Sequence, residues 1–330
     1  MRLTPHLLRT WADDHQIPDL TLAELDYRLT QALIAVYGDP FLRDRLYLKG
    51  GTALNKLFFP AVNRLSVDLD FNAVGSKAQV LAERAQLTNQ VMTLLAGQKA
   101  GYHLAHDYRR YEQSTIRADF APLSGSPRQH LKLEISFIER VPILGREERP
   151  LALSDGANTT LITTYRLEEL TATKLRALYG RRKGRDIYDL AQIGAFDLDE
   201  RALRKMTLYY FYRARMLFNY GAFRTNVEEK LRRRGFADDV RGLIRADQPF
   251  DWREASQSVL DRFTFLENLD DRDEEFLHLA RYLLGGPVSE HVGETLALIE
   301  YPIARLMEGL LITSEAAAMR QDDILLFAGA

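Results

Sequence analysis

The pattern of apolar and polar positions divides the chain into a mixed first half and a helical second half. Apolar residues at helical spacing predict a helix over 22–37. Alternation of polar and apolar residues along 130–138 predicts a strand with one apolar face. The same patterns predict the remaining elements of the first half: strands at 46–49 and 67–71, helices at 52–59 and 77–95, and two strands between 102 and 120.

Strand patterns disappear after about residue 166, and helical spacing continues to the C-terminus. The stretch PLALSDGANTT, around residue 155, has the Pro, Gly, Ser, Asp and Asn content of a linker. We therefore predict an α/β (α+β) fold with a mixed sheet in residues 1–155, followed by a helical domain in residues 156–330. The acidic run at 270–275 is expected to be a solvated helix start.

Composition narrows the classes of function. The chain has 330 residues, 46% of them hydrophobic and 27% charged, as in an ordinary globular protein. It contains no cysteine, which excludes disulfides, thiolate catalysis and cysteine-bound metals. Its start lacks the apolar core of a signal peptide, and no apolar run is long enough to cross a bilayer, so a cytoplasmic protein without a membrane partner is expected. With a net charge of −2, nucleic acid would have to meet local basic patches.

Two aspartates interrupt the apolar strand predicted at 67–71. Asp68 and Asp70 share one face with Ser66, and the apolar residues point to the other face. Aspartate is depleted in strands, so a pair on one face needs a reason. Carboxylates a few ångströms apart suit two bridged divalent cations, and hard oxygen ligands favour Mg²⁺.

A glycine turn and a third acidic residue extend this pattern. Gly50 and Gly51 precede Thr52 at a helix start, where free backbone N–H groups bind phosphate oxygens. Glu134 lies on the polar face of the 130–138 strand and would complete a metal cage. Taken together, the motifs predict a nucleotidyltransferase active site. Taken singly, the glycine pair also fits an ordinary tight turn, and the acidic residues also fit solvent-exposed strand faces.

Lys174 lies in the middle of a predicted apolar helix face, an unfavourable position for an ammonium unless it meets an anion or reaches water. Asp186 and Asp189 share a face of the next helical stretch. Two interpretations remain open. Lys174 and an aspartate form a structural ion pair, or Lys174 contacts a nucleotide phosphate while the aspartates orient active-site groups.

A dense basic loop separates these two helical stretches, and contact with an RNA backbone is its natural use, although a solvated turn has the same pattern. Its basic residues are Arg181, Arg182, Lys183 and Arg185. A second basic run follows at 232–234. The aromatic residues between 209 and 218 fit a helical core better than a base-stacking platform.

Four separated motifs carry a resemblance to a known family. KGGTAL, RLSVDLDF, KLEIS and ELTATKLRAL…RDIYDL occur in the order found in the AbiEii/AbiGii toxin family of nucleotidyltransferases, which includes the MenT-type toxins. The resemblance implies a polymerase-β-like nucleotidyltransferase core followed by a helical domain. It also implies the toxin of a type IV toxin–antitoxin or phage-defence pair, with a cognate antitoxin encoded nearby. Relatives transfer nucleotides from an NTP to RNA, in several cases to the tRNA 3′ acceptor end.

The resemblance also assigns roles to residues. Asp68 and Asp70 correspond to the metal-binding pair, Lys174 to a nucleotide-contacting lysine, and either Asp186 or Asp189 to a late acidic residue. Ser66 corresponds to a serine that is modified in some relatives. The family's glycine motif here is Gly-Gly-Thr, so Thr52 would replace the serine hydroxyl found in most nucleotidyltransferases.

The combined prediction is a Mg²⁺-dependent enzyme that transfers NMP from an NTP to RNA. Metal ligands are predicted at Asp68, Asp70 and Glu134, and catalytic roles at these three and at Lys174, Asp186 and Asp189. Nucleotide contacts are predicted at Lys49, Gly50, Gly51, Thr52, Ser66 and Lys174. The alternatives are transfer to a protein hydroxyl or a small molecule such as an antibiotic, and an inert module that only binds RNA or a partner.

Overall fold

The computed structural model describes two compact units, each treated separately below. Described residues are 3–59, 64–98, 100–109, 112–151, 159–233, 235–236, 238–240, 242–244, 250–285, 306–307 and 310. The first unit takes its described residues from 1–142, 146–165 and 242–247. The second takes its described residues from 143–145, 166–241 and 248–330.

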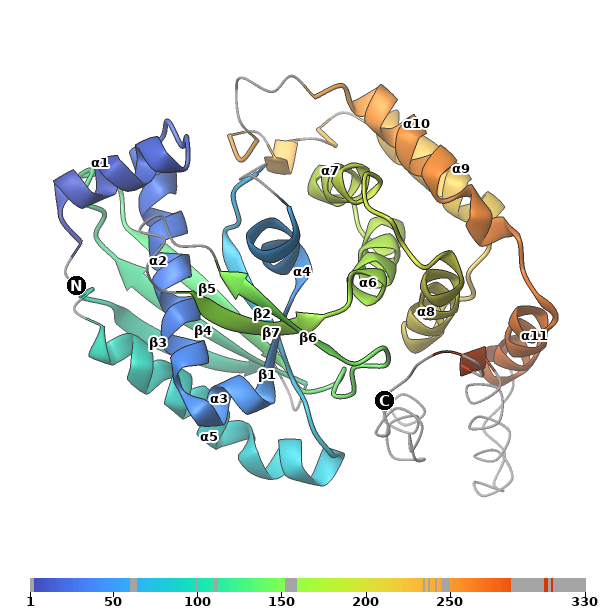
Figure 1. Cartoon of the computed structure of the whole chain (residues 1–330), viewed down its shortest axis with the longest axis horizontal. Coiled ribbons are helices and arrows are strands. Elements are labelled where there is room, and N and C mark those ends of the chain that lie inside the picture. The colour runs from blue at the N-terminus through green and yellow to red at the C-terminus, as the bar shows by residue number, and fades with distance from the viewer. Residues whose placement is uncertain are drawn as a thin grey trace. The chain divides into compact units, whose positions relative to one another are not determined.

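A mixed seven-stranded sheet forms the centre of the first unit, in the order β3-β4-β5-β2-β1-β7-β6 (Figure 1). Strand β2 pairs antiparallel with β1 and parallel with β5, and β1 pairs parallel with β7. The strands are β1 (Leu46–Lys49), β2 (Asp68–Ala73), β3 (His103–Arg109), β4 (Gln113–Phe120), β5 (Gln129–Ser136), β6 (Arg146–Leu151) and β7 (Thr160–Tyr165).

Helices cover this sheet. The two long helices, α2 and α5, contact each other and both pack on strands of the sheet (Figure 1). They bury the apolar side of the alternating strands, where Leu69, Phe71, Leu133 and Ile135 have no exposed surface. The helical elements are α1 (Pro5–Asp14), α2 (Leu20–Gly38), α3 (Pro40–Arg45), α4 (Gly50–Ala53), the π-helical turn η1 (Leu54–Phe58) and α5 (Lys77–Gly97).

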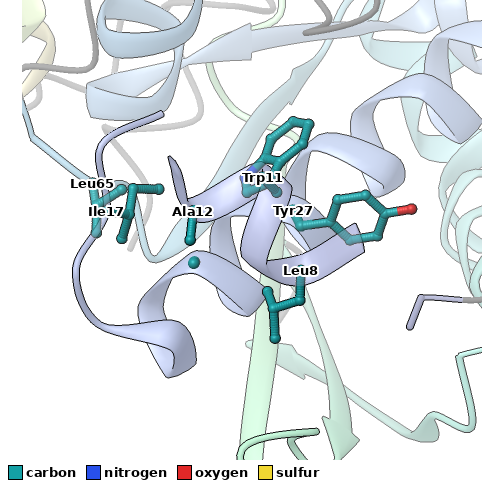
Figure 2. Packing of buried hydrophobic residues seen from close by; sticks show 7 residues of the cluster. Leu8, Trp11, Ala12, Ile17, Tyr27 and Leu65 are labelled. Carbon is teal, nitrogen blue, oxygen red and sulfur yellow. The ribbon is translucent and has the colours of Figure 1, made fainter. Parts of the chain in front are cut away.

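A smaller apolar cluster fixes the segment that leads into β2. Trp11 of α1 packs edge-on against Tyr27 of α2 with ring centroids 5.2 Å apart, and Leu65 joins the same cluster (Figure 2). The backbone N–H of Leu65 donates to the carbonyl of Leu243 at 2.8 Å, and Arg64 forms an isolated antiparallel β-bridge with Ile244. Residues 64 and 65 are therefore held on both sides immediately before the strand that carries Asp68 and Asp70.

The second unit is helical in its described residues. Helix α6 contacts α7, α8 and α9, and α10 runs beside α9 (Figure 1). The aromatic stretch of α8 and the loop after it contributes core, because Tyr209, Tyr210, Phe211 and Phe218 are buried. Its elements are α6 (Leu167–Gly180), α7 (Gly184–Ile193), α8 (Glu200–Arg213), α9 (Tyr220–Leu231), η2 (Asp238–Val240), α10 (Trp252–Arg262), η3 (Thr264–Glu267) and α11 (Asp271–Gly285).

The predicted fold class is confirmed, with two local differences. Strands β6 and β7 were not predicted, and β7 extends the first unit to Tyr165, whereas the predicted linker lies mostly in 152–158, outside the described residues. The acidic run does start a helix, α11, and Asp271 and Glu274 are exposed, but the run is not solvated throughout. Asp273 is fully buried, and its carboxylate pairs with Lys205 at 2.5 Å and Arg204 at 2.6 Å. None of the described helices is long and apolar enough to cross a membrane.

Candidate active site

The register of three neighbouring strands assembles the acidic residues of the first unit. Asp70 of β2 lies opposite Lys49 of β1 on one side and Glu134 of β5 on the other. Asp68 lies two residues earlier on the same face of β2, opposite Lys132. The sheet therefore brings together all three acidic residues that the sequence singled out here.

The glycine turn lies directly against one of these carboxylates. Gly50 has a φ of +72°, and a Cβ placed on it would approach Asp70 Oδ2 to 3.0 Å. Any larger residue would be strained in this conformation and would crowd the carboxylate. Glycine is needed here both for the backbone conformation and for the close approach of the turn to β2.

Thr52 uses its hydroxyl to hold this turn on the aspartate strand. The side chain is buried, and Oγ1 donates to the backbone carbonyl of Asp68 at 2.6 Å. This bond gives Thr52 a positioning role, where the sequence predicted a phosphate contact by the hydroxyl. The Thr52 hydroxyl thus connects the glycine turn to the strand that carries the aspartates.

Asn55 is a further positioning residue that sequence reasoning missed. Its Nδ2 donates to the carbonyl of Gly51 at 2.7 Å, one turn earlier, and it lies in the π-helical turn η1. Such turns are rare and often occur at functional sites. Next to it, Lys56 bonds Asp26 at 2.6 Å and Thr30 at 3.1 Å, which fixes η1 to α2.

Negative charge is crowded at this end of the strands. Burial, the neighbouring Asp68 and a hydrogen bond with Glu134 together raise the pKa of Asp70 to about 6, against the opposing effect of Lys49. A raised pKa means that nearby positive charge does not compensate for burial and for the neighbouring carboxylates. The cluster is therefore chemically suited to a cation.

Two nearby lysines form ion pairs, one with Glu134 of the cluster and the other with Glu139 outside it. Lys132 Nζ lies 2.5 Å from Glu134 Oε1, and Lys49 Nζ lies 3.6 Å from Glu139 Oε2. Within the described residues, no group of three or more His, Asp or Glu side chains is arranged so that it could hold a metal ion. The predicted three-ligand cage is thus not assembled, although its carboxylates are neighbours.

Ser66 precedes the aspartates in a buried position. Only 3% of its surface is exposed, and its Oγ makes no hydrogen bond to a described residue. The chain just before Ser66 is held in place by Leu65, through its apolar cluster and its backbone bond to Leu243. The serine that the sequence placed on the aspartate face is thus largely shielded from solvent.

In the second unit, Lys174 of α6 lies in a buried ion-pair cluster with α7. Its Nζ is 2.8 Å from Asp189 Oδ2 and 3.2 Å from Asp186 Oδ1, and both aspartates are fully buried. Arg181 Nε adds a bond to Asp186 Oδ2 at 2.8 Å. The predicted pairing of Lys174 with the aspartates is therefore present, and it involves both of them.

The electrostatics of this cluster are the reverse of those at Asp70. Burial alone would raise the pKa of Asp186, but Lys174 and then Arg181 outweigh it and hold that pKa below its usual value. The ion pairs thus account for the buried lysine within the second unit, without a ligand.

Ion pairs fix two of the four basic residues of the basic loop. Arg181 pairs with Asp186, and Arg185 Nε lies 3.8 Å from Asp239 Oδ2. Arg182 and Lys183 are exposed. Two of the four predicted RNA contacts, Arg181 and Arg185, thus also form ion pairs, although Arg181 remains exposed like Arg182 and Lys183.

Lys230 of α9 connects this loop to the second basic run. Its Nζ donates to the carbonyls of Leu178 and Tyr179 at the end of α6. Burial lowers the pKa of Lys230 to about 8, with Arg182 and Arg233 acting in the same direction against Asp186. Two basic runs distant in sequence therefore lie near one lysine, which no sequence pattern indicated.

Paired aspartates on a strand, with a glycine turn against one of them and a further acidic strand beside it, correspond to the active-site layout of nucleotidyltransferases. The family model described as "Nucleotidyl transferase AbiEii toxin, Type IV TA system" matches residues 31–261. The chain belongs to this family, as its motifs suggested.

Among the solved structures, MenT4 supports the fold. MenT4, a nucleotidyltransferase toxin from Mycobacterium tuberculosis H37Rv, is 21% identical with a TM-score of 0.62, covering 92% of this chain and 99% of MenT4. JHP933 from Helicobacter pylori is 17% identical with a TM-score of 0.45, covering 78% of this chain and 96% of JHP933. No curated protein matches the chain. The predicted nucleotidyltransferase fold is confirmed, and family membership supports a transferase that uses NTP and acts beside an antitoxin.

Proposed function

We propose that the chain transfers a nucleoside monophosphate from an NTP to the 3′-hydroxyl of an RNA, with the tRNA acceptor end as the target, and thereby blocks translation. The observation that carries this proposal is the position of Gly50 directly on the carboxylate of Asp70, with Asp68 and Glu134 beside it. A glycine turn of the kind that can bind phosphate and an acidic cluster thus lie side by side in the first unit.

The reaction forms one bond and breaks one bond. The RNA 3′-oxygen attacks the α-phosphorus, the bond from that phosphorus to the bridging oxygen breaks, and pyrophosphate leaves. The backbone N–H groups of Gly50 and Gly51 would bind triphosphate oxygens, while Thr52 and Asn55 keep the turn in place. A carboxylate of the cluster would accept the proton of the hydroxyl, and we assign this role to Glu134 after Lys132 has released it.

A divalent cation fits the donor set. Asp68 and Asp70 supply hard oxygen ligands, and the raised pKa of Asp70 reflects its burial together with neighbouring negative charge, which a cation would offset. Asp68 and Asp70 would hold Mg²⁺, with Glu134 as the third ligand after it leaves Lys132. The cation supplies charge neutralisation at the phosphates when it is bound.

Family membership supports the biological setting. The toxin description implies an antitoxin partner, and a role in phage defence in the cytoplasm is part of the proposal. RNA would meet the exposed residues of the basic loop, Arg182 and Lys183, in a chain whose total charge is slightly negative. In this proposal Lys174 belongs to the ion-pair cluster that holds α6 to α7.

The test is nucleotide transfer by the purified full chain. Each α-³²P-labelled NTP is mixed with Mg²⁺ and total tRNA, cell protein or an aminoglycoside, and the labelled product is identified. We expect label at tRNA 3′ ends, lost on addition of EDTA. Label on protein or on the small molecule instead would assign a different acceptor, and no label on any of the three would refute the transferase activity.

A further inference from the structure

A pocket in the second unit combines aromatic rings with arginines. It has a volume of about 530 Å³ and is formed by the end of α9, the segment that follows it, and the start of α10. The residues that matter for its chemistry are Phe236, Trp252, Arg232, Arg233 and Arg253. The proposed transfer reaction does not use this pocket.

The aromatic side of the pocket is preorganised. Trp252 meets Phe236 at an interplanar angle of 88° and Phe250 at 73°, so both neighbours pack edge to face and neither stacks on the indole. Trp252 is partly exposed as the first residue of α10. A partly exposed indole fixed by its neighbours has a low entropy cost for stacking on a flat ligand.

The charged side favours an anion. Arg232 and Arg233 are exposed, and neither makes an ion pair with any other residue that the structure describes. The acidic lining consists of Glu228, whose carboxylate is bonded by Arg224 at 3.1 Å, and the exposed Asp238. The arginines therefore outnumber the carboxylates in the pocket lining.

The pocket is tied to the basic loop. The N–H of Gly184 donates to the carbonyl of Phe236 at 3.1 Å and to Asp239 Oδ1 at 2.8 Å. Arg182 and Arg233 both act on Lys230, as described above. The basic surface of the loop and the aromatic pocket are thus parts of one region of the second unit.

We infer that this pocket binds a nucleotide of single-stranded RNA, with the base stacked on Trp252 and the phosphate held by Arg232 and Arg233. Stacking combined with basic groups that follow the backbone is how proteins hold single strands without reading sequence. A free nucleotide has the same chemistry, but the adjoining basic loop favours a strand that continues beyond the pocket. The inference rests on the proposed function, because it takes RNA as the substrate.

The test measures binding of a fluorescein-labelled single-stranded 12-nucleotide RNA by anisotropy at several salt concentrations, with EDTA present and NTP absent. We expect Trp252→Leu to weaken binding about tenfold with an unchanged salt slope, and Trp252→Phe to keep most of the affinity. Arg232→Gln/Arg233→Gln should weaken binding and lower the slope of log affinity against log salt by about 1.4.

A matched control removes the same charge elsewhere in the unit. Arg215→Gln/Arg281→Gln changes two exposed arginines outside the pocket and should leave affinity within about twofold of the parent. Parent-like binding by both pocket variants would overturn the inference, as would an equal loss in the control. Displacement of RNA by ATP alone at the same site, with the same sensitivity to Trp252→Leu, would make it a mononucleotide site and overturn the RNA assignment.

Failure of this inference is distinguishable from failure of the proposed function. A raised KM for RNA with unchanged kcat in Trp252→Leu supports both. Transfer with a parent-like KM refutes the pocket alone. RNA bound in the pocket without transfer to any RNA refutes the proposed transfer to RNA alone.

Discussion

Two clusters of aspartates in this molecule have opposite electrostatics. At Asp70 in the first unit the pKa is raised to about 6, and at Asp186 in the second unit it is lowered. Both carboxylates lose hydration, so the difference comes from charge. Lys174 and Arg181 contact Asp186 directly, whereas Asp70 has two acidic neighbours and only the more distant influence of Lys49. Asp186, whose charge is balanced by direct cation contacts, belongs to a structural cluster, whereas Asp70, whose charge is not balanced, is suited to bind a cation from outside.

The largest expected effect is on catalysis at the first cluster. Asp70→Asn keeps the shape but removes a ligand charge, so nucleotide transfer should fall at least about a hundredfold while the fold is retained. Steady-state transfer and a thermal melt measure the two effects. Asp107→Asn, an equivalent change at an exposed position of the edge strand β3, should remain fully active. Near-normal transfer by folded Asp70→Asn would remove this aspartate from the active site.

Stability should depend on the second cluster. Lys174→Met removes the cation shared by two buried carboxylates and should lower the free energy of unfolding by about 3 kcal/mol. Chemical denaturation measures this change, with the exposed Lys183→Met as the stability control, expected within about 0.5 kcal/mol of the parent. An unchanged stability together with a tenfold loss of transfer would instead favour the nucleotide-contacting role that the sequence suggested for Lys174.

The pH dependence of stability should separate the clusters. Because the pKa of Asp70 is raised, the folded protein binds this proton more tightly than the unfolded chain does. The resulting contribution to the free energy of unfolding is present near pH 4 and is lost as pH rises through about 6. In EDTA, the stability of Asp70→Asn relative to the parent should therefore increase by about 2 kcal/mol between pH 4 and pH 7.

The lowered pKa of Asp186 has the opposite sign, so its contribution is present at neutral pH and is lost on acidification. Thermal melts of the parent and Asp70→Asn between pH 4 and pH 7 test the first sign. Melts of the parent and Lys174→Met below pH 4, where Asp186 becomes protonated, test the second. A constant difference between the parent and Asp70→Asn would show that Asp70 is not crowded by negative charge. Millimolar Mg²⁺ should raise the melting temperature of the parent at pH 7 more than that of Asp70→Asn.

The sequence predicted the elements whose patterns are local. Alternation fixed the faces of β2 and β5, and the glycine pair marked the turn, because these signals depend only on neighbouring residues. It also raised the Lys174 ion pair as one of two interpretations. It could not choose between them, because the choice depends on the distances between α6 and α7.

Contacts between distant segments left no local pattern. Strand β7 was missed although it pairs with β1 inside the sheet, because its sequence TLITTY follows a stretch of linker composition. Asp273 was expected in solvent because its partners, Lys205 and Arg204, lie about seventy positions earlier in the chain. The same holds for Arg182 and Arg233, whose common neighbour is Lys230.

The path of the chain has a consequence for dissecting the protein. Residues 143–145, between β5 and β6, belong to the second unit, where Glu169 accepts hydrogen bonds from the N–H groups of Ile143 and Leu144 at 3.0 and 2.9 Å. Conversely, Leu243 and Ile244 belong to the first unit and hold residues 64 and 65, just ahead of the aspartate strand. No single cut separates the two units. A fragment ending at Tyr165 would lack the support that Leu243 and Ile244 give to residues 64 and 65, so we expect it to be less stable than the same unit in the full chain.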